Sequence, residues 1–279
     1  MVAWALTAEK RGQKATVKEH MNEAGTIGGT IRTLFAKGVR FTTVIDLGCA
    51  DGHFFLFNYC MGSFAGACPV NIDANPIYGG SLNAIKNVLG GHFVIAAVSD
   101  ALGETEMTNA VHPYWSSLRP PDDPYWERIN GMSQNKTLVP TVTLDALKER
   151  LNLQPPFLLK LDVQGAEAAA LRGARETLKE TDVVIVETDL DDFAAINGIL
   201  EEAGFALYDL TEIKRIDHDA LGWFYPVYLN RRLQAIRARA FWDPVQNEDI
   251  VKQQKLRRQA ILSKNAELLE LIRTSGRAR

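Results

Sequence analysis

Short runs of apolar residues recur along the first 230 positions of the chain, and stretches with helical periodicity separate them. The runs are unbroken instead of alternating between apolar and polar residues, a pattern typical of parallel strands that are covered on both faces of a sheet. Five such runs are predicted to be strands: 43–48, 67–73, 93–99, 157–162 and 183–187.

Two of the intervening stretches show clear apolar helical faces. One face consists of Ala168, Leu171, Ala174 and Leu178, and the other of Phe193, Ile196 and Leu200. Gly204 is placed to end the second helix, because glycine readily adopts the left-handed conformation found after helices. This alternation predicts an α/β fold with a doubly wound, mostly parallel sheet. Two later apolar segments, 205–210 and 223–229, predict a final pair with an antiparallel strand at the edge of the sheet.

Residues 109–136 interrupt this alternation. They include four prolines and four large aromatic residues, and a loop so long in a compact domain is usually functional, so we expect a lid over a binding site. Beyond residue 230 the sequence becomes charged and keeps helical spacing. We therefore predict an N-terminal helical segment at 1–40, an α/β domain at 41–230 and a basic helical extension at 231–279.

Composition narrows the class of protein. Apolar residues make up 46% of the chain and charged residues 23%, which excludes disorder or a coiled coil as a description of the whole. No apolar run approaches the roughly 18 residues of a membrane-spanning helix. The first six residues are too short a run for a signal peptide, so we expect a cytoplasmic protein. Three cysteines without paired spacing give no support to a disulfide framework or a zinc site.

The net charge of −3 conceals an uneven distribution along the chain. Residues 231–279 hold 12 Lys and Arg against 5 Asp and Glu, whereas the remainder holds 19 against 29. A basic extension on an acidic body is predicted to pack as helices against that body, or across a homodimer. Aromatic residues are not interleaved with the charges after Trp242, which disfavours nucleic acid as the partner.

Acidic residues mark the ends of the predicted strands. Asp46, Asp73, Asp162 and Glu187 each close a strand, and Asp100 follows another. A single acid at such a place is an ordinary turn former or helix cap. Several acids at one rim repel each other and favour a ligand, and open α/β sheets bind their ligands beyond the carboxyl ends of the strands.

The segment from Asp46 to Gly52 combines an acid with three small residues, Gly48, Ala50 and Gly52, directly after the first strand. Small residues let the backbone turn tightly and approach a ligand closely. A dinucleotide site would place glycines at positions 48, 50 and 53, and two of these three are missing. The pattern matches instead the first motif of class I S-adenosylmethionine-dependent methyltransferases.

Two further positions fit a nucleoside ligand. Asp73 ends the next strand, where a carboxylate can accept hydrogen bonds from both hydroxyls of a ribose. Ser99 and Asp100 follow the third strand and are candidates to contact the adenine edge. For Asp73, and likewise for Ser99 and Asp100, the alternative is an ordinary role in a turn, without contact to a ligand.

The segment 156–174 resembles the signature of the FkbM methyltransferases, which reads roughly Leu-Lys-Ile-Asp-Val-Glu-Gly-Ala-Glu followed by Leu-Lys-Gly-Ala. Residues 139–147 resemble the family's Val-x-Thr-Leu-Asp-x-Leu, and 116–118 its Ser-Ser-Leu. The resemblance extends over about 43–230, and Gln164 stands where the family usually has Glu. It implies a Rossmann-like class I methyltransferase fold.

The resemblance also implies methyl transfer from S-adenosylmethionine to a hydroxyl of a small-molecule or saccharide acceptor, either a sugar, a glycan or a natural product. Asp162, at the end of the fourth strand, is then the best-placed general base. Alternatively it holds a divalent cation such as Mg²⁺, with Glu187 or Asp189 as a further ligand. Lys160 is expected to neutralise these acids.

Two other functions stay open at this point. A nicotinamide-dependent oxidoreductase would share the strand, turn and helix at the start of the domain. A non-catalytic protein that keeps the cofactor pocket and acts through its basic extension would share the whole pattern.

Overall fold

A computed structural model describes residues 25–120, 122, 123, 126, 132–215 and 220–236, and single residues between 252 and 267; for 132–134 it describes the backbone alone. The chain divides into two units, Met1–Gln234 and Ala235–Arg279, and the fold reported below is that of the first. The predicted helical segment at 1–40 falls partly outside the described residues, and most of the predicted extension at 231–279 does too.

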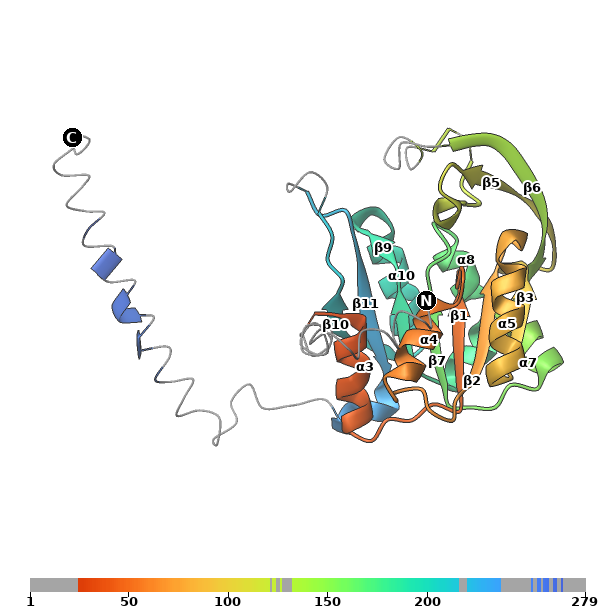
Figure 1. Ribbon diagram of the computed structural model, residues 1–279. Helices are drawn as coiled ribbons and strands as arrows, with labels where there is room; N and C mark the ends of the chain where they lie inside the picture. The colour runs from red at the N-terminus through yellow and green to blue at the C-terminus, as the bar shows by residue number, and fades with distance from the viewer. Residues whose placement is uncertain are drawn as a thin grey trace, which may run out of the picture. The chain divides into compact units, whose positions relative to one another are not determined.

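The centre of the fold is a mixed sheet with the strand order β3-β2-β1-β7-β8-β11-β10 (Figure 1). Its strands are β1 (Thr43–Leu47), β2 (Cys68–Asp73), β3 (His92–Ile95), β7 (Phe157–Leu161), β8 (Thr181–Val186), β10 (Phe205–Thr211) and β11 (Trp223–Asn230), and the short β9 (Thr188–Asp189) pairs with β11. The pairs from β3 through to β8 are parallel, whereas β11 runs antiparallel to both of its neighbours. The predicted doubly wound, mostly parallel α/β sheet is therefore confirmed.

The predicted pair, β10 and β11, is antiparallel and lies at the end of the sheet, with β10 at the edge and β11 one position inside it. The connection from β8 to β10 runs through the helix α10 (Leu190–Glu202), and a helical crossover returns the chain to a parallel direction. β11 then runs antiparallel to β10 and fills the gap between β8 and β10.

The third predicted strand, 93–99, is divided between two sheets. β3 ends at Ile95, and Ala97–Val98 forms β4, which belongs to a second sheet of order β4-β6-β5. That sheet is built on the long hairpin of β5 (Gly103–Ala110) and β6 (Met132–Val142). The predicted loop at 109–136 therefore begins and ends in strands, and its described middle holds the 3₁₀ turn η3 (Pro113–Trp115).

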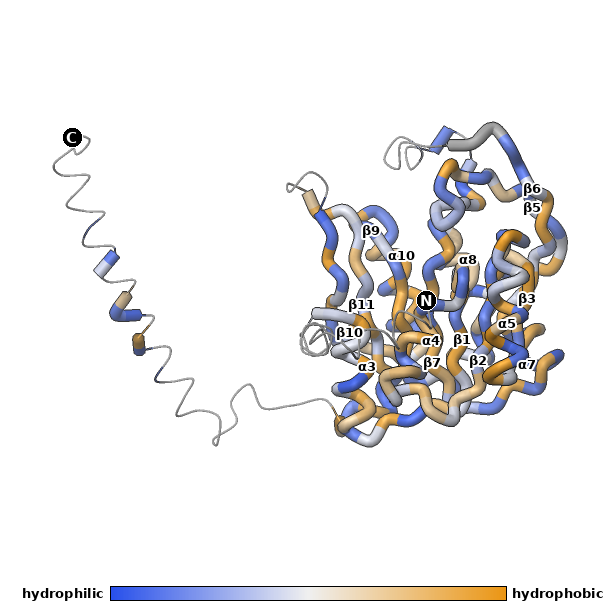
Figure 2. Tube along the Cα trace, in the orientation of Figure 1, coloured by the Kyte–Doolittle hydropathy of each residue, from blue (hydrophilic) through white to orange (hydrophobic). Residues whose placement is uncertain are grey.

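Helices cover both faces of the central sheet (Figures 1 and 2). On one side lie α3 (Ile27–Ala36), α4 (His53–Cys60) and α5 (Gly79–Leu89), the last after the 3₁₀ turn η2 (Pro76–Tyr78). On the other lie α7 (Leu144–Leu151), α8 (Glu167–Arg172), α9 (Arg175–Lys179) and α10, whose apolar side chains join those of the strands in the main core. Figure 2 shows hydrophobic residues along the strands and mixed colours along the helices.

Most residues of both predicted helical faces are buried in this core, namely Leu171, Ala174 and Leu178 of the first and Ile196 and Leu200 of the second, whereas Ala168 and Phe193 are half-buried. The first is divided between α8 and α9 at Gly173, where a Cβ atom would overlap the carbonyl oxygen of Ser99. The second is α10, and Gly204 follows it with a φ of +88°. After β11 the chain forms the 3₁₀ turn η4 (Arg231–Ile236), where Arg232 pairs with Asp182 at 2.8 Å. Among the described residues, no helix has the length and apolar character needed to span a membrane.

Candidate active site

A cavity of about 610 Å³ opens at the carboxyl ends of the central parallel strands. The register explains which side chains reach it, because Leu47 pairs with both Ile72 and Leu161, and Leu161 pairs with Val186. The residues one step beyond these pairs form a row along the cavity wall: Gly48, Asp73, Asp162 and Glu187. The row crosses four neighbouring strands at the point where the strand order reverses, which is where open α/β sheets bind ligands.

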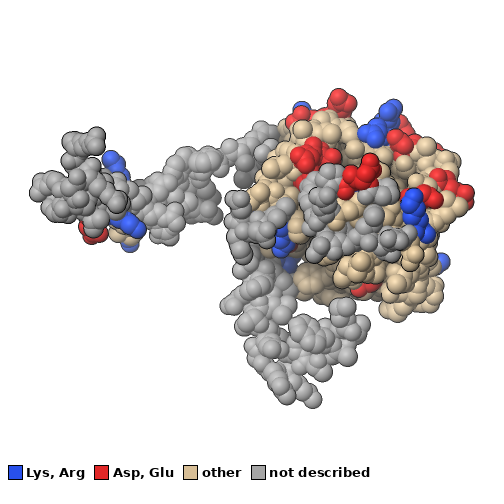
Figure 3. All heavy atoms as spheres, turned by 90° about the horizontal axis from the view of Figure 1, so that it is seen from above, with Lys and Arg blue, Asp and Glu red and all other residues tan. Residues whose placement is uncertain are grey.

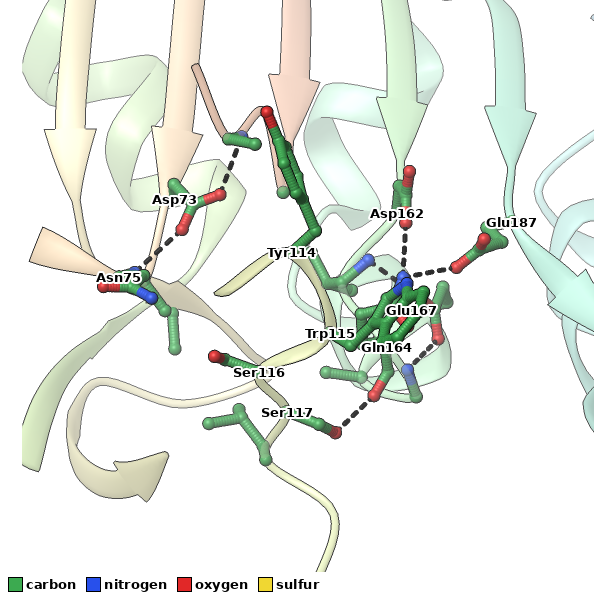
Figure 4. Close-up of a pocket in the computed structure, with 18 of the residues that line it drawn as sticks. Asp73, Asn75, Tyr114, Trp115, Ser116, Ser117, Asp162, Gln164, Glu167 and Glu187 are labelled. Atoms are coloured by element: carbon green, nitrogen blue, oxygen red, sulfur yellow. Dashed lines mark hydrogen bonds between the residues drawn. The ribbon is translucent and has the colours of Figure 1, made fainter. Parts of the chain in front are cut away.

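Asp73 lies at one end of this row with both carboxylate oxygens held by the backbone (Figure 4). Oδ2 accepts the N–H of Ala50 and Oδ1 accepts the N–H of Asn75, each at 2.8 Å. Burial raises the pKa of Asp73 to about 6, although these two N–H groups act to lower it. Each oxygen keeps a second lone pair for a ligand, so the side chain is fixed and still able to accept two hydroxyl protons.

The glycine-rich turn after β1 brings the backbone close to the centre of the cavity. Gly48 has a φ of +68°, and a Cβ atom there would overlap the carbonyl oxygen of Asp162. Ala50, which also lines the cavity, has a φ of +48°. Gly52 does not line the cavity; it has a φ of +81° and a Cβ atom there would overlap the end of Ile85, so it serves the packing of α4 against α5.

Asp46 lies beneath the cavity and forms none of its wall. Its side chain is completely buried and pairs with Lys160 Nζ at 3.2 Å. The same ammonium group lies 3.2 Å from Asp162 Oδ2 and donates to the carbonyl of Gly48 at 3.4 Å. Burial acts to lower the pKa of Lys160, but the two carboxylates outweigh it and raise the pKa. A charged Lys160 therefore lies between Asp46 and the cavity. The sequence predicted that Asp46 binds the cofactor, whereas the structure places Asp46 behind Lys160 and outside the cavity wall.

Ser99 and Asp100 are not brought to the cavity. Because the chain leaves the central sheet at Ala96, these two residues follow β4 instead of β3, and Asp100 faces Arg172 at 3.4 Å. The wall on this side consists of apolar residues of the same segment and of β5: Ala96, Ala97, Val98 and Met107. Contact with a flat aromatic ring would therefore come from apolar packing, not from the two polar side chains that the sequence suggested.

Asp162 stands near the middle of the row, within a network of hydrogen bonds (Figure 4). Gln164 Nε2 donates to Asp162 Oδ1 at 2.8 Å and to Glu187 Oε2 at 2.7 Å. The Tyr225 hydroxyl lies 2.9 Å from Asp162 Oδ2 and 3.1 Å from Glu187 Oε1. Burial acts to raise the pKa of Asp162, but the charge of Lys160, followed by hydrogen bonds with neighbouring side chains, brings it below its usual range.

Glu187 behaves in the opposite way. Burial, followed by the negative charge of Asp162, raises the pKa of Glu187 well above its usual range. The pKa values of the two neighbouring carboxyl groups are therefore shifted in opposite directions. Such a separation is typical of sites that handle protons.

Glu167 is turned away from this chemistry, although it lines the cavity. Its Oε1 accepts the N–H of Val163 and its Oε2 the N–H of Gly165, both at 2.9 Å. Burial raises the pKa of Glu167 to about 7, although the backbone donors act to lower it. These contacts make Glu167 a cap for the backbone of the turn before α8.

The segment after β5, from the turn η3 to Arg119, lines the cavity, and Figure 4 shows its residues Tyr114 to Ser117 beyond the ends of the strands. The Tyr114 hydroxyl donates to Asp51 Oδ2 at 3.3 Å, and Ser117 Oγ donates to the carbonyl of Gln164 at 2.5 Å. Arg119 pairs with Asp192 of α10 at 2.7 Å. The expected lid therefore corresponds in part to this segment, which three polar contacts attach to the rest of the site.

The cavity wall is more acidic than basic. Six acidic side chains line it, against Lys160, Arg119 and Arg215. Figure 3 shows both signs of charge on the face seen from above, with acidic side chains in several groups. A cavity with this balance suits a ligand that carries a positive charge.

Sequence reasoning missed Tyr225, Ser117 and Arg119 as members of the site. Tyr225 lies within an apolar strand and carries no local signal. Ser117 belongs to the Ser-Ser-Leu segment, whose resemblance to the family gave a location but no role. Arg119 is an ordinary loop arginine until the fold places Asp192 and Gly165 beside it.

A family model, that of the methyltransferase FkbM domain, matches residues 51–207, more than half of the chain. The chain belongs to the FkbM methyltransferase family. Because FkbM proteins are methyltransferases, this chain is a methyltransferase enzyme, which sets aside the nicotinamide-dependent oxidoreductase and the non-catalytic binding protein as its function. A comparison with curated protein sequences finds no match.

Solved structures that show some similarity to this chain include two methyltransferases. A precorrin-6y C5,15-methyltransferase from Geobacter metallireducens is 10% identical, with 72% of this chain and 88% of that chain covered and a TM-score of 0.38. A protein assigned as an RNA methyltransferase from Pyrococcus horikoshii is 12% identical, with 75% and 86% covered and a TM-score of 0.38. Identities this low concern the fold alone.

The FkbM family implies S-adenosylmethionine as the cofactor, and the residues of the cavity fit it. The side chain of Asp73 is fixed with free lone pairs, Gly48 and Ala50 bring the backbone of the turn to the cavity wall, and the wall beside β4 is apolar. A divalent cation fits less well. No three Asp, Glu, His or Cys residues in the described part of the chain are placed to hold a metal ion, and N–H and O–H donors bridge Asp162 and Glu187.

Proposed function

We propose that this FkbM methyltransferase transfers a methyl group from S-adenosylmethionine to a hydroxyl group of a sugar, a glycan or a related natural product, with Asp162 as the general base. The observation that carries the proposal is the position of Asp162, a carboxyl group fixed in the cavity wall by Gln164 and Tyr225, with the Lys160 ammonium group 3.2 Å from Oδ2 to favour its ionised form. An alcohol has to lose its proton as its oxygen forms the new bond, so it needs a base at this place.

The end of the cavity beside β2 supports binding of the nucleoside. Asp73 accepts hydrogen bonds from the ribose hydroxyls, and the turn at Gly48 and Ala50 allows the backbone to lie against the ligand. The bound cofactor supplies an electrophilic methyl group on a sulfonium. Three strand spacings separate the ends of β2 and β8, about 14 Å, which leaves room for an acceptor beside Glu187.

The end beside β8 supports a hydroxyl-rich acceptor. Asp189 and Asp192 line this part of the cavity with carboxylates that accept hydrogen bonds from hydroxyl groups. Trp115 and Trp223, which are 43% and 44% exposed, present indole rings at its edge. Aromatic rings of this kind pack against the apolar faces of sugar rings while their surroundings stay wet.

In the chemical step, Asp162 accepts the proton of the acceptor hydroxyl while the oxygen takes up the methyl group. Holding the two reactants in line supplies most of the acceleration, about 7–11 kcal/mol in favourable cases. Because Asp162 is 21% exposed, it can return the proton to water after the reaction. Lys160 keeps Asp162 ionised before the step.

A direct assay tests the proposal. The purified full chain is incubated with methyl-labelled S-adenosylmethionine and a panel of p-nitrophenyl glycosides and free disaccharides, and mass spectrometry locates the label. We expect an O-methylated glycoside and S-adenosylhomocysteine in equal amounts. Label found on a nitrogen or a carbon of some other acceptor, with none on any hydroxyl, would contradict the proposal.

A further inference from the structure

Four contacts join the two carboxyl groups of the site through Gln164 and Tyr225, and their protons can be counted. The amide NH₂ of Gln164 has two protons, one for Asp162 Oδ1 and one for Glu187 Oε2. The hydroxyl of Tyr225 has a single proton but lies within hydrogen-bond distance of an oxygen on each carboxyl group, at 2.9 and 3.1 Å. One of these two contacts therefore needs a proton that a carboxyl group supplies.

The surroundings decide which carboxyl group carries this proton. Asp162 Oδ2 faces the Lys160 ammonium group at 3.2 Å, which favours its ionised form. Glu187 forms no ion pair within the described part of the chain. The extra proton then belongs on Glu187 Oε1, which donates it to the Tyr225 oxygen, while Tyr225 donates its own proton to Asp162 Oδ2. With this assignment all four contacts are satisfied.

We propose that Asp162 and Glu187 act as a pair that carries a single proton on Glu187, and that Gln164 and Tyr225 are the positioning residues that hold this arrangement. The inference rests on the proposed function, because it explains how the base of that reaction stays ionised. An ionised Glu187 would place a second negative charge against Asp162 and raise the affinity of Asp162 for protons. The raised pKa of Glu187 and the lowered pKa of Asp162 agree with this assignment.

Other charged groups surround the pair on every side. They are Lys160 on β7, Asp46 on β1, Glu167 on α8, Asp189 on β9, Asp192 on α10, and Arg119 and Arg215 from loops of the cavity wall. Of these, Lys160 alone has a charged atom within ion-pair distance of Asp162 among the described residues. It acts in the same direction as Gln164 and Tyr225, toward an ionised Asp162.

Gln164 is the residue at which this chain departs from the FkbM signature, which usually has Glu there. Its backbone has a φ of +54°, which turns the side chain back between the two carboxyl groups (Figure 4). A carboxylate in place of the amide would be a third acid with no proton to donate. Such a site would need further protons or a cation, so Gln164 suits a proton-sharing pair and not a metal.

Amide replacements test where the proton lies. Glu187→Ala should lower kcat for the best glycoside of the panel by about tenfold or more, and Glu187→Gln should recover most of that loss, since a carboxamide is neutral, donates and accepts. Asp162→Asn should lower kcat at least 100-fold and recover nothing relative to Asp162→Ala. Equal losses for Glu187→Gln and Asp162→Asn, or equal tolerance of both, would overturn the inference.

The pH dependence separates positioning from mere packing. Tyr225→Phe removes the proton donated to Asp162 Oδ2, so the acidic limb of the pH profile of kcat should move to higher pH by about one unit. Affinity for S-adenosylhomocysteine should change less than about twofold. An unchanged acidic limb in Tyr225→Phe would contradict the assignment, whatever happens to the melting temperature.

Two measurements need no acceptor and so remain informative if the proposed function fails. In carboxyl-¹³C NMR of glutamate-labelled protein, one signal should stay in the protonated range well above pH 7, where Glu167 with its pKa of about 7 is ionised, and this signal should disappear in Glu187→Gln. Calorimetry with MgCl₂ should detect binding to Gln164→Glu and none to the wild-type chain. A fully ionised set of glutamates, or Mg²⁺ binding by the wild type that Asp162→Asn abolishes, would refute the single-proton pair even in an active O-methyltransferase.

Discussion

At the scale of single residues, neighbouring acids differ in their roles because their partners differ. Asp46 and Asp162 share one lysine, yet Asp46 is completely buried in β1 and Asp162 reaches the cavity. The sequence places both residues at strand ends and cannot distinguish their roles. The direction of a strand does not tell which side chain extends beyond the end of the sheet into the cavity. The same holds for Asp73, whose two backbone donors appear only once the turn after β1 is folded.

Asp73 should dominate affinity for the cofactor. Asp73→Ala removes two charge-assisted hydrogen bonds to a ribose, so it should weaken binding of S-adenosylhomocysteine by about 2–4 kcal/mol. Isothermal titration calorimetry measures this loss. Asp100→Ala is the matched control, because Asp100 pairs with Arg172 outside the cavity. A comparable loss in both variants would mean that Asp73 is not the ribose ligand.

The same carboxylate should make cofactor affinity depend on pH. The pKa of Asp73 is about 6 in the free protein, and hydrogen bonds from hydroxyl groups favour its ionised form. Affinity for S-adenosylhomocysteine should thus be constant above pH 7 and fall as the pH drops through 6, by up to about tenfold per unit. The dependence should disappear in Asp73→Asn, and binding that strengthens on acidification would contradict the sign.

At the scale of elements, the sequence predicted the strands that consist of unbroken apolar runs. The strands from β1 to β8 in the central sheet carry such runs because both of their faces are covered. The hairpin of β5 and β6 escaped notice, since β5 reads Gly-Glu-Thr-Glu-Met-Thr-Asn-Ala and only Met107, Thr108 and Ala110 are buried. That missed hairpin is also why Ser99 and Asp100 were expected at the cavity, since it draws Ala97 and Val98 into a second sheet.

The close approach of β1 and β7 should make Gly48 intolerant of any side chain. Gly48→Ala places a Cβ atom into the carbonyl group of Asp162 and requires a left-handed φ, so it should lower the free energy of unfolding by about 2–4 kcal/mol. Gly198→Ala in α10 is the control. No atom lies within 4 Å of a Cβ there, and alanine should raise stability by about 0.5–1 kcal/mol. Urea unfolding of both variants measures the difference, and equal stabilities would refute the predicted overlap.

At the scale of the whole molecule, charge separates the basic extension from the rest of the chain. The prediction that this extension packs as helices, against its own domain or across a homodimer, concerns residues that are mostly outside the described part. The first residues of the predicted extension are described, and they contact the α/β domain: Arg232 pairs with Asp182 and donates to the carbonyl of Lys179. A deletion can therefore begin after Gln234 without disturbing these contacts.

Removing residues 235–279 should lower either the molecular mass of the assembly or the melting temperature. The reason is that a helix with an apolar face gains little stability in water unless that face packs against another surface. Light scattering and thermal unfolding of the full chain and the 1–234 fragment check this, and limited proteolysis of the full chain locates the first cleavage. Unchanged mass, melting temperature and methyl transfer in the fragment would show that the extension does not contribute to assembly.

The position of β11 has a consequence for biosynthesis. The strand comes last of those in the sheet but is inserted between β8 and β10, and it carries Tyr225. Chains emerge from the ribosome with their N-terminal parts first. A nascent chain that ends before Tyr225 already contains Asp73, Asp162 and Glu187, but it has an open gap in its sheet and lacks one of the two side chains that bridge the carboxyl groups. Translation must therefore pass beyond β11 before the site is complete, so a stalled or prematurely terminated product lacks part of its candidate active site.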